Sequence, residues 1–526
     1  MKKINIKSII VLGLATVAMA SCSDVADEIT SIVYNRNFSP TGVEAKVRNR
    51  TNIELSWNRA DGVTQYNVEV FANDSLTFAG SPVKTLSVTP DEIPVTITGL
   101  EGETKYSFRV QATDGTASRD SKWAGAYAKT EAEQIFKTVK EADIKGKQVT
   151  LRWTAGEEAA TITLTPGDIV YDVTAEDIEA GAATITGLTP ETKYTAVLKR
   201  SNGKTRGTIE FTTGIDLAET DILVKAGNDL AEAIKNAPEG YRLVVEPGIY
   251  GIATDVAEFG GSVTIKKAIT IKGLRQNEHP VIKGRFKVEA ELALDQVALD
   301  GTGTDGGQCF DFTADGSIES FSITNSEISN YTKGMLYINK KVAINKITID
   351  GCLIKNIECD GGDFIDSRTG GWNTLTMTNS TVYNSVIGRA VVRFDNNSNV
   401  SVSAITKIEN CTFAMTGTGN KNSYGFLHIR YTGNSSVFKN NVVADFDQQR
   451  GFSDQASTSP AEFDNNFYFN TKNLLSKDAA STKTPAFYDT TGTNLQANPF
   501  ADEAKGDLTI INDDIKDKKA GDPRWY

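Results

Sequence analysis

Hydrophobic residues occupy every second position in several short runs between about residues 37 and 214. The runs Ile53–Trp57, Tyr66–Val70 and Tyr106–Val110 are examples, and turn-forming residues separate them. A period of two puts alternate side chains on opposite faces of a β-strand, so that one face of each run can be buried. The pattern predicts short antiparallel strands packed as a β-sandwich, in preference to a barrel.

The sandwich pattern occurs twice. The phrase Ile-Thr-Gly-Leu, followed closely by Glu-Thr-Lys-Tyr, ends once at Tyr106 and once at Tyr194, and each copy has an early strand tryptophan, Trp57 or Trp153. Both copies resemble fibronectin type III domains, a resemblance that makes the two tyrosines tyrosine-corner residues. The second copy has no evident counterpart of Tyr66, which predicts that this module is trimmed.

A different repeat begins after Gly214. Asn228–Ala237 predicts a short amphipathic helix and Leu243–Tyr250 a strand and turn, a pairing that resembles the helix-capped entrance of pectin-degrading β-helices. A phrase made of an apolar residue, a spacer, a Gly, Gln or Asn and a second apolar residue recurs at intervals of roughly 23 to 31 residues. Repetition at intervals of this length predicts the stacked coils of a right-handed parallel β-helix. We call the third residue of this phrase the anchor, and the anchors are Gly273, Gln296, Asn325, Gly351, Asn379, Asn410, Asn440 and Asn465.

Asparagine suits the anchor position because it tolerates the left-handed backbone conformation, which Gly273 and Gly351 adopt at no steric cost. The asparagine amide can also bond the same residue one coil above or below. We therefore expect the anchors to lie in one file along the β-helix.

The cysteines are predicted to be free and buried. Cys352 and Cys411 follow anchors two coils apart, with Ser380 between them, so the two thiols would lie about 10 Å apart and beyond disulfide reach. Cys309 and Cys359 share this prediction. The alternative is a redox pair or a metal cluster, although no spacing here resembles a zinc motif.

A second alternating phrase in each coil predicts a further sheet with outward side chains. Stacking these phrases predicts two outward columns, one with Asp311, Asn339, Asp366, Arg393 and Arg430, and a neighbouring one with Arg368 and Asp395. Such columns could bind sugars, because arginine pairs bidentately with a uronate carboxylate and aspartate accepts bonds from hydroxyls. The alternative is a set of interstrand ion pairs on a solvated sheet.

Other side chains near these columns could take part in chemistry. Asp360, Asp363 and Asp366 could bind Ca²⁺, although their spacing matches no defined calcium loop and a plain acidic turn is the alternative. His428 could be a general base beside Arg430, or a surface histidine. Arg393, Arg430, Asp366 and His428 are thus the catalytic candidates. Four aromatic residues could stack on sugars or pack loops against coils: Tyr337, Trp372, Tyr383 and Tyr424.

The N-terminus looks like an export signal. Three lysines precede the apolar run Ile9–Ala20, which is too short to span a bilayer comfortably. The run ends Met-Ala-Ser-Cys, which resembles the bacterial lipobox, and this resemblance implies that Cys22 becomes the lipid-modified mature N-terminus; an ordinary signal peptide is the alternative. The acidic residues that follow resemble the surface-export signal of Bacteroidota lipoproteins. We expect an outer-membrane lipoprotein displayed on the cell surface.

Composition limits the classes of function. The chain has 526 residues, and its 67 acidic and 55 basic side chains give a net charge of −12, which argues against nucleic acid as the main partner. The fold class predicted from these patterns is all-β, with two sandwiches followed by a right-handed parallel β-helix, and the length of the chain accommodates these parts. The expected division is 1–21 signal peptide, 22–36 linker, 37–131 and 132–214 fibronectin type III modules, and 215–526 β-helix with a C-terminal tail.

The chain resembles uncharacterised Bacteroidota lipoproteins of the DUF4957 and DUF5123 kind, which join fibronectin modules to a pectin-lyase-like helix; the closing Gly521–Trp525 is typical of them. This resemblance carries no assigned chemistry. The paired arginines of common pectate lyases and the polygalacturonase motifs are missing from the sequence. The leading hypothesis is a binding protein for an acidic, pectin-like polysaccharide, with an outer-membrane glycan transporter as a possible partner. The alternatives are a uronate-specific polysaccharide lyase, with Ca²⁺ as its possible cofactor, and a surface adhesin or scaffold without glycan affinity.

Overall fold

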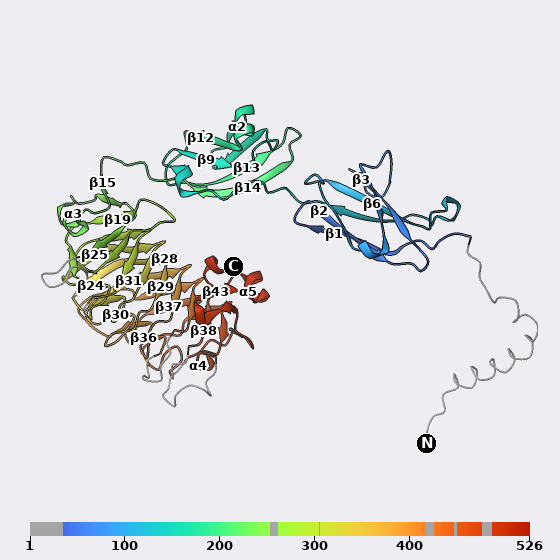
Figure 1. Cartoon of the computed structure of the whole chain (residues 1–526). Helices are drawn as coiled ribbons and strands as arrows, with labels where there is room; N and C mark the ends of the chain where they lie inside the picture. The colour runs from blue at the N-terminus through green and yellow to red at the C-terminus, as the bar shows by residue number, and fades with distance from the viewer. Residues whose placement is uncertain (1–34, 253–260, 305, 417–424, 447–449, 476–486) are drawn as a thin grey trace, which may run out of the picture. The chain divides into compact units, whose positions relative to one another are not determined.

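The computed structural model describes residues 35–252, 261–304, 306–416, 425–446, 450–475 and 487–526. Apart from short helices it is all-β, and two β-sandwiches precede a parallel β-helix (Figure 1). The predicted fold class is confirmed in these respects. Cys22, on which the lipid anchor depends, lies outside the described residues.

The first sandwich consists of a three-stranded and a four-stranded antiparallel sheet. Between them lie the side chains predicted to face inward, and the ring centroids of Trp57 and Tyr66 are 5.2 Å apart. Tyr106 is a tyrosine-corner residue, because its hydroxyl accepts a bond from the Glu101 N–H at 3.0 Å. The strands are β1 (Thr41–Arg48), β2 (Asn52–Asn58) and β5 (Val95–Ile97) in one sheet, and β4 (Lys84–Val88), β3 (Gln65–Ala72), β6 (Lys105–Thr113) and β7 (Ala124–Lys129) in the other, with 3-10 turns η1 (Pro90–Glu92) and η2 (Ala117–Arg119).

The second sandwich is complete, so the prediction of a trimmed module was wrong. Ile162, on the strand β10 (Thr161–Thr165) that corresponds to β3, is fully buried and pairs with Leu198, as Val68 of the first copy pairs with Val110. Trp153 is also buried. One sheet contains β12 (Ala182–Thr186), β9 (Gln148–Arg152) and β8 (Ile144–Lys145), and the other β11 (Ile169–Asp172), β10 (Thr161–Thr165), β13 (Lys193–Lys199) and β14 (Thr205–Thr212), with η3 (Glu141–Asp143) and α2 (Ala175–Ala180).

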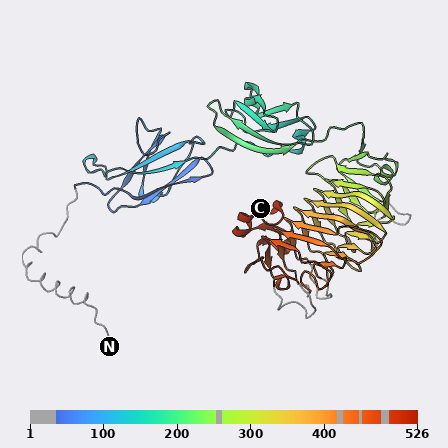
Figure 2. The same ribbon diagram turned by 180° about the vertical axis from the view of Figure 1, so that it is seen from behind.

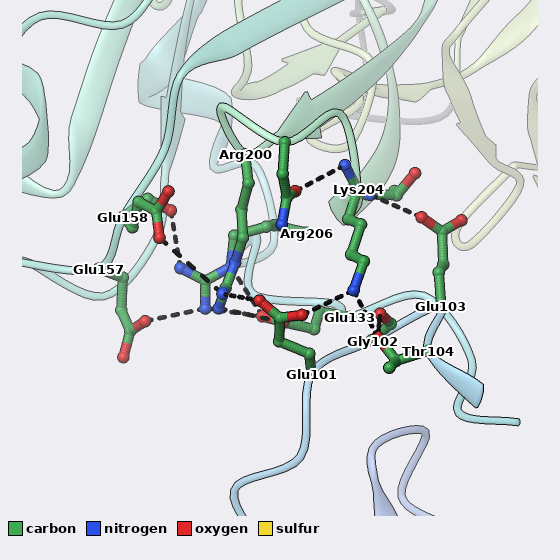
Figure 3. Close-up of polar contacts among 12 residues, drawn as sticks. Glu101, Gly102, Glu103, Thr104, Glu133, Glu157, Glu158, Arg200, Lys204 and Arg206 are labelled. Atoms are coloured by element: carbon green, nitrogen blue, oxygen red, sulfur yellow. Dashed lines mark hydrogen bonds and ion pairs between the residues drawn. The ribbon is translucent and has the colours of Figure 1, made fainter. Parts of the chain in front are cut away.

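Ion pairs join the first sandwich to β14 and its preceding turn (Figure 3). Arg206 is 4% exposed and its guanidinium lies 2.7 Å from the carboxylate of Glu133, in the connecting segment, and 2.9 Å from that of Glu157. Lys204 Nζ donates to Glu101 of the first sandwich at 2.6 Å. These residues belong to one compact unit of the chain. The network therefore connects the two sandwiches through partly exposed ion pairs at Glu101 and holds the connecting segment through the buried pair at Glu133.

Arg206→Ala should lower the free energy of unfolding of this unit by about 2–4 kcal/mol, because it leaves the Glu133 carboxylate largely buried beside fewer cations. Thermal unfolding of the full chain measures the effect. Lys193→Ala is the matched control, since its pair with Glu210 is more than half exposed and should contribute less than about 0.5 kcal/mol. Equal destabilisation by the two variants would contradict the role of the buried pair.

The β-helix has three parallel sheets, and among the described residues the coils from β16 (Arg242–Val245) to β36 (Leu427–Ile429) contribute one strand to each of them in turn. The first sheet contains β15 (Asp221–Val224), β16 (Arg242–Val245), β19 (Ile269–Gly273), β22 (Leu292–Asp295), β25 (Gly316–Thr324), β28 (Val342–Asp350), β31 (Gly371–Thr378), β34 (Ile405–Glu409), β37 (Ser435–Lys439) and β39 (Glu462–Asp464). The predicted helix is α3 (Leu230–Asn236), and it buries Leu230 and Ile234 at the entrance of the β-helix. The stacking of the coils is visible in Figures 1 and 2.

The remaining strands of the coils belong to the second and third sheets. The second contains β17 (Ile249–Gly251), β20 (Val281–Lys283), β23 (Ala298–Asp300), β26 (Glu327–Ser329), β29 (Leu353–Lys355), β32 (Thr381–Tyr383), β35 (Thr412–Ala414), β38 (Val442–Ala444), β40 (Phe467–Phe469) and β41 (Thr493–Asn494). The third contains β18 (Ser262–Ile265), β21 (Arg285–Val288), β24 (Phe310–Phe312), β27 (Leu336–Ile338), β30 (Ile365–Ser367), β33 (Val392–Phe394) and β36 (Leu427–Ile429). Apolar side chains from all three sheets fill the interior.

The eight anchors lie in one file, as predicted, because the residues just before them are register partners from coil to coil. Seven of them have a left-handed backbone, with φ between 47° and 63°. Gly273 does not, and it is needed for another reason: a Cβ there would lie 2.1 Å from the carbonyl oxygen of Gln296 in the next coil. Close approach of two coils selects this glycine.

The predicted bonding between anchor amides is only partly right. Asn465 donates to the Asn440 side chain at 2.8 Å, but Asn325 and Asn379 donate instead to aspartates at the end of the preceding coil's strand. A second ladder, which the sequence analysis missed, follows the second sheet: Asn356 bonds Asn330 at 3.1 Å and Asn384 bonds Asn356 at 2.9 Å.

The four described cysteines are free and buried, which confirms the prediction. The Cys352 N–H donates to Ser380 Oγ at 3.0 Å, so the small residues that follow the anchors do stack. Burial raises the pKa of the Cys352 thiol to about 12. These cysteines are core residues and are unreactive at neutral pH.

The C-terminal tail packs on the outward side of the second sheet (Figures 1 and 2). Its closing motif is held by two threonines, because Thr381 Oγ1 donates to Asp522 at 2.8 Å and the Asp522 N–H donates to Thr412 Oγ1 at 3.0 Å. The tail therefore occupies the second sheet's face, which leaves the third sheet as the place to look for a site. Its elements are β42 (Phe500–Asp502), η4 (Glu503–Lys505), β43 (Asp507–Ile510), α5 (Asp513–Lys518) and η5 (Pro523–Trp525). The short helix α4 (Lys472–Leu475) lies between β40 and β41 and buries Leu474 in the interior of the β-helix.

Candidate functional site

The candidate residues lie on the outward face of the third sheet, in two rows that run along the β-helix. Register partners define the first row: Lys287, Asp311, Tyr337, Asp366, Arg393 and His428. Asn339 and Arg430 were predicted to lie in this row, and that prediction was wrong. Tyr337 and His428 take their places.

The second row lies two residues further along each strand and contains Asn339, Arg368, Asp395 and Arg430. Backbone bonds from the latter three residues to the coil before them follow the same register, with N–O distances of 2.9 Å for Arg368 and Asp395 and 2.7 Å for Arg430. A shift of two residues preserves the alternation of inward and outward side chains, so the hydrophobic pattern could not detect it.

The aspartates and arginines of the two rows form one ion-pair network. Arg368 Nη2 lies 2.9 Å from Asp366 Oδ2 and 3.4 Å from Asp363 Oδ2, and Arg368 Nε also bonds Asp366. Arg393 Nη1 lies 3.3 Å from Asp363 Oδ2. Asp363 is fully buried and also accepts the Ala390 N–H at 2.9 Å. The two buried carboxylates therefore face two guanidinium groups.

The network continues into the next coils through Asp395. Arg393 makes a bidentate pair with this carboxylate, with both N–O distances at 2.9 Å, and Arg430 Nη2 bonds it at 2.6 Å. Three arginines and three aspartates thus balance one another. Their exposure differs, because the side chain of Arg393 is 9% exposed and that of Arg430 is 39% exposed.

Burial and neighbouring charges shift the pKa values of the carboxyl groups in opposite directions. Burial, together with the nearby Asp366, raises the pKa of Asp363. Burial acts in the same sense on Asp395, but bonds from Arg393 and Arg430 outweigh it and lower the pKa of that group. Of these two acids, Asp363 is therefore the one whose ionised form is disfavoured by its surroundings.

His428 is buried beside two arginines, so it is not the surface histidine of the alternative interpretation. Burial and the charges of Arg393 and Arg430 lower its pKa to about 4. The imidazole is therefore neutral at pH 7. A general base needs access to a substrate proton, and a side chain that is 4% exposed does not offer it in this structure.

The predicted calcium ligands do not form a cation site. Asp363 and Asp366 already face arginines, and Asp360 is exposed on the preceding turn. A cation would compete with guanidinium groups for the same oxygens. Within the described residues no cluster of three or more His, Cys, Asp or Glu side chains could hold a metal ion.

The aromatic candidates have different environments. Tyr337 is half-buried in the first row and remains available to a ligand. Trp372 is fully buried against Phe394, with ring centroids 4.6 Å apart, so it cannot stack on a sugar. Tyr383 packs a loop, because its hydroxyl donates to the Glu503 carbonyl oxygen at 3.0 Å. Tyr424 lies outside the described residues.

Three cations near Asp311 were missed by the sequence analysis. Arg285 and Lys287 on β21 and Lys340 after β27 all act electrostatically on Asp311. Asp311 is half-buried, and burial raises its pKa despite these cations. In the described parts of the chain none of the three cations has a carboxylate within ion-pair distance. The alternation Arg-Phe-Lys-Val around buried Phe286 and Val288 could have revealed two of them.

No helix in the described parts of the chain is long and apolar enough to cross a membrane.

Comparisons with known proteins agree with this architecture. A fibronectin type III domain model matches residues 38–124, which is the first sandwich. Domains of unknown function DUF4957 and DUF5123 match residues 248–385 and 405–525, both within the β-helix and its tail. A search of curated proteins gave no match.

Solved fibronectin arrays are also similar to part of the chain. A segment of two fibronectin type III domains from chicken tenascin is 18% identical over 33% of this chain and 97% of its own, with a TM-score of 0.24. The central fibronectin III array of RIM-binding protein is 14% identical over 34% and 62%, with a TM-score of 0.15. Chicken CNTN1 FN1–FN3 is 15% identical over 34% and 65%, also at 0.15. The chain thus has a fibronectin type III domain followed by regions that match DUF4957 and DUF5123.

Proposed function

We propose that this protein is a surface lipoprotein that binds an acidic, pectin-like polysaccharide along the third sheet of its β-helix. Cys22 would anchor it to the outer membrane, the two sandwiches would act as a spacer, and an outer-membrane glycan transporter would receive the captured chain. The observation that carries the proposal is the group of cations Arg285, Lys287 and Lys340 on one face of a protein whose net charge is −12.

The second row extends this cationic face. Arg368 and Arg430 each use Nε and Nη2 to bond an aspartate, and these bonds do not involve Nη1. Both side chains are partly exposed, at 29% and 39%. A guanidinium with a remaining donor can bond a carboxylate or a sulfate of a ligand while it stays in its ion pair.

The arrangement suits an extended polyanion. Lys287, Lys340, Arg368 and Arg430 lie on different coils of the third sheet, and successive coils are about 4.8 Å apart. A chain that runs along the β-helix would meet these cations one after another, with Tyr337 between them as a surface on which a sugar ring can stack. Several weak contacts in a row would supply the affinity.

The geometry favours binding over lyase chemistry. A uronate lyase needs an accessible base and a cation that stabilises the enolate. Arg393 is 9% exposed and engaged by two aspartates, and His428 is buried. Asp366, Arg393 and His428 therefore stabilise the coil contacts rather than face a substrate, and of the four catalytic candidates Arg430 is the one that is partly exposed.

The double variant Lys287→Glu with Lys340→Glu should lower the affinity for polygalacturonate at least about tenfold, because each reversal replaces an attraction of roughly 1 kcal/mol by a repulsion. Affinity gel electrophoresis measures it, and added salt should weaken binding by the wild type. Lys105→Glu with Lys129→Glu, two exposed lysines on the first sandwich, is the control for net charge.

Three outcomes would contradict the proposal. No retardation of the wild type by either acidic or neutral glycans would exclude a glycan-binding protein. An unsaturated product that absorbs ultraviolet light would favour the lyase. Partners captured without dependence on carbohydrate would favour the adhesin or scaffold.

A further inference from the structure

A cavity of about 570 Å³ lies where the C-terminal tail meets the last coils of the β-helix. Its lining comes from both sides: Met415 and Asp445 end strands of the second sheet, and Asn498 and the segment Phe500–Ala504 belong to the tail. Glu503 is the buried acid of this contact, with 6% of the residue exposed.

Two carboxyl groups face each other beside this cavity. Glu503 Oε1 is buried, and none of the described donors bonds it. Asp445, from the turn after β38, lies within hydrogen-bonding reach of the Glu503 carboxyl group. Two ionised carboxylates in contact repel each other, so the pair requires a proton or a cation between its oxygens.

The surrounding groups favour a proton over a metal ion. Asn498 donates an amide N–H to Glu503, Asn470 donates one to Asp445, and the Met415 N–H also points to Glu503. A metal ion would need oxygen ligands at these positions. The nearby ammonium of Lys505 is held by Asp502 at 2.6 Å.

The contact between the carboxyl groups also argues against a glycosidase site here, because glycosidases keep their two carboxyl groups at least about 5 Å apart. Tyr383 is the remaining titratable group at this contact, and its hydroxyl donates to the backbone of Glu503 rather than to the carboxyl group. A structural role fits these observations better than a catalytic one.

We propose that the Glu503–Asp445 pair is a pH-sensitive latch, which shares one proton while the tail is docked and releases the tail when that proton is lost. The latch lies over apolar surface, because Phe500, Leu508 and Ile510 of the tail pack on Val442 and Phe467 of the second sheet, among others. Opening would uncover this surface.

The direction of the pH dependence follows from the linkage of proton binding to docking. Burial, reinforced by Asp445, raises the pKa of Glu503 to about 7, against 4.5 for the free side chain. The docked tail therefore holds an extra proton between these values. Docking is strongest below about pH 4.5 and weakens as the pH rises through 7.

Hydrogen exchange of the full chain tests the latch. In the wild type, protection factors of the β43 and α5 amides should fall about tenfold between pH 6 and pH 9. In Glu503→Gln the amide can donate an N–H to Asp445 at every pH, so protection should change less than twofold. Asp514→Asn, the same kind of change on an exposed turn of α5, is the control and should retain the wild-type profile.

Constant protection in the wild type from pH 6 to pH 9, or an equal fall in Glu503→Gln, would overturn the latch. Recovery of protection at pH 9 on addition of 1 mM Ca²⁺ would overturn it in favour of a cation site. A fall in the wild type alone, insensitive to Ca²⁺, supports it. Glycan binding plays no part in this test.

Discussion

Replacing Arg393 by alanine should lower the free energy of unfolding of the β-helix by about 3–5 kcal/mol. The guanidinium lies between Asp363, which is fully buried, and Asp395, with N–O distances of 3.3 Å and 2.9 Å. Its removal leaves the buried Asp363 carboxylate with the Ala390 N–H at 2.9 Å and with Arg368 at 3.4 Å as the cation that still bonds it among the described residues. Hydrogen exchange of the β30 and β33 amides in increasing denaturant measures the loss.

The matched control is Arg430→Ala, which removes a partly exposed partner from the same Asp395 and should cost at most about 1 kcal/mol. Similar losses of unfolding free energy in both variants would show that the buried ion pairs stabilise the β-helix no more than the exposed pair does. The comparison also bears on function, because a loss of any activity in Arg393→Ala would follow from the damaged fold.

Phe438→Ala should be equally severe, at about 3–5 kcal/mol, because it opens a cavity in an aromatic cluster that fills the last coils. The Phe438 ring centroid lies 5.2 Å from those of Phe426 and Phe452, and 6.2 Å from that of Phe463. The side chain is fully buried. Hydrogen exchange of the β37 amides measures the effect.

Two further variants separate the cavity from other causes. Phe438→Leu keeps most of the volume and should cost less than about 1.5 kcal/mol. Ile511→Ala removes a side chain that is 55% exposed in the tail and should stay within about 0.5 kcal/mol of the wild type. A loss in Phe438→Ala no larger than in Ile511→Ala would show that the cluster is loosely packed.

Much of the candidate site could be predicted, but not its assembly. Outward acids and arginines on a further sheet were correctly predicted at Asp311, Asp366 and Arg393, because alternation around buried apolar residues assigns each side chain to a face. Asn339 and Arg430 were placed in the wrong row, because a shift of two residues leaves that alternation unchanged. The order of coil contacts, which only the folded chain defines, decides such a shift.

Which residues of the site are buried could also not be predicted from the sequence. Asp363 and Arg393 look like surface residues by composition, yet they are buried together, since each neutralises the other's charge. His428 is neutral at pH 7 because burial and the charges of two neighbouring arginines lower its pKa. These effects depend on distances between residues from different coils.

The sequence by itself determined the coils, since anchors at a repeated interval require a repeated backbone turn. The alternation of apolar and polar residues also gives each strand one face toward the interior and one face toward the outside. The sequence also determined the free cysteines, because small residues after the anchors are stacked two coils apart. The tertiary structure alone decided which face the tail covers and which carboxyl groups meet there. Residues such as Asp445 and Glu503 carry no shared pattern along the chain, and only the return of the tail onto the second sheet brings them together.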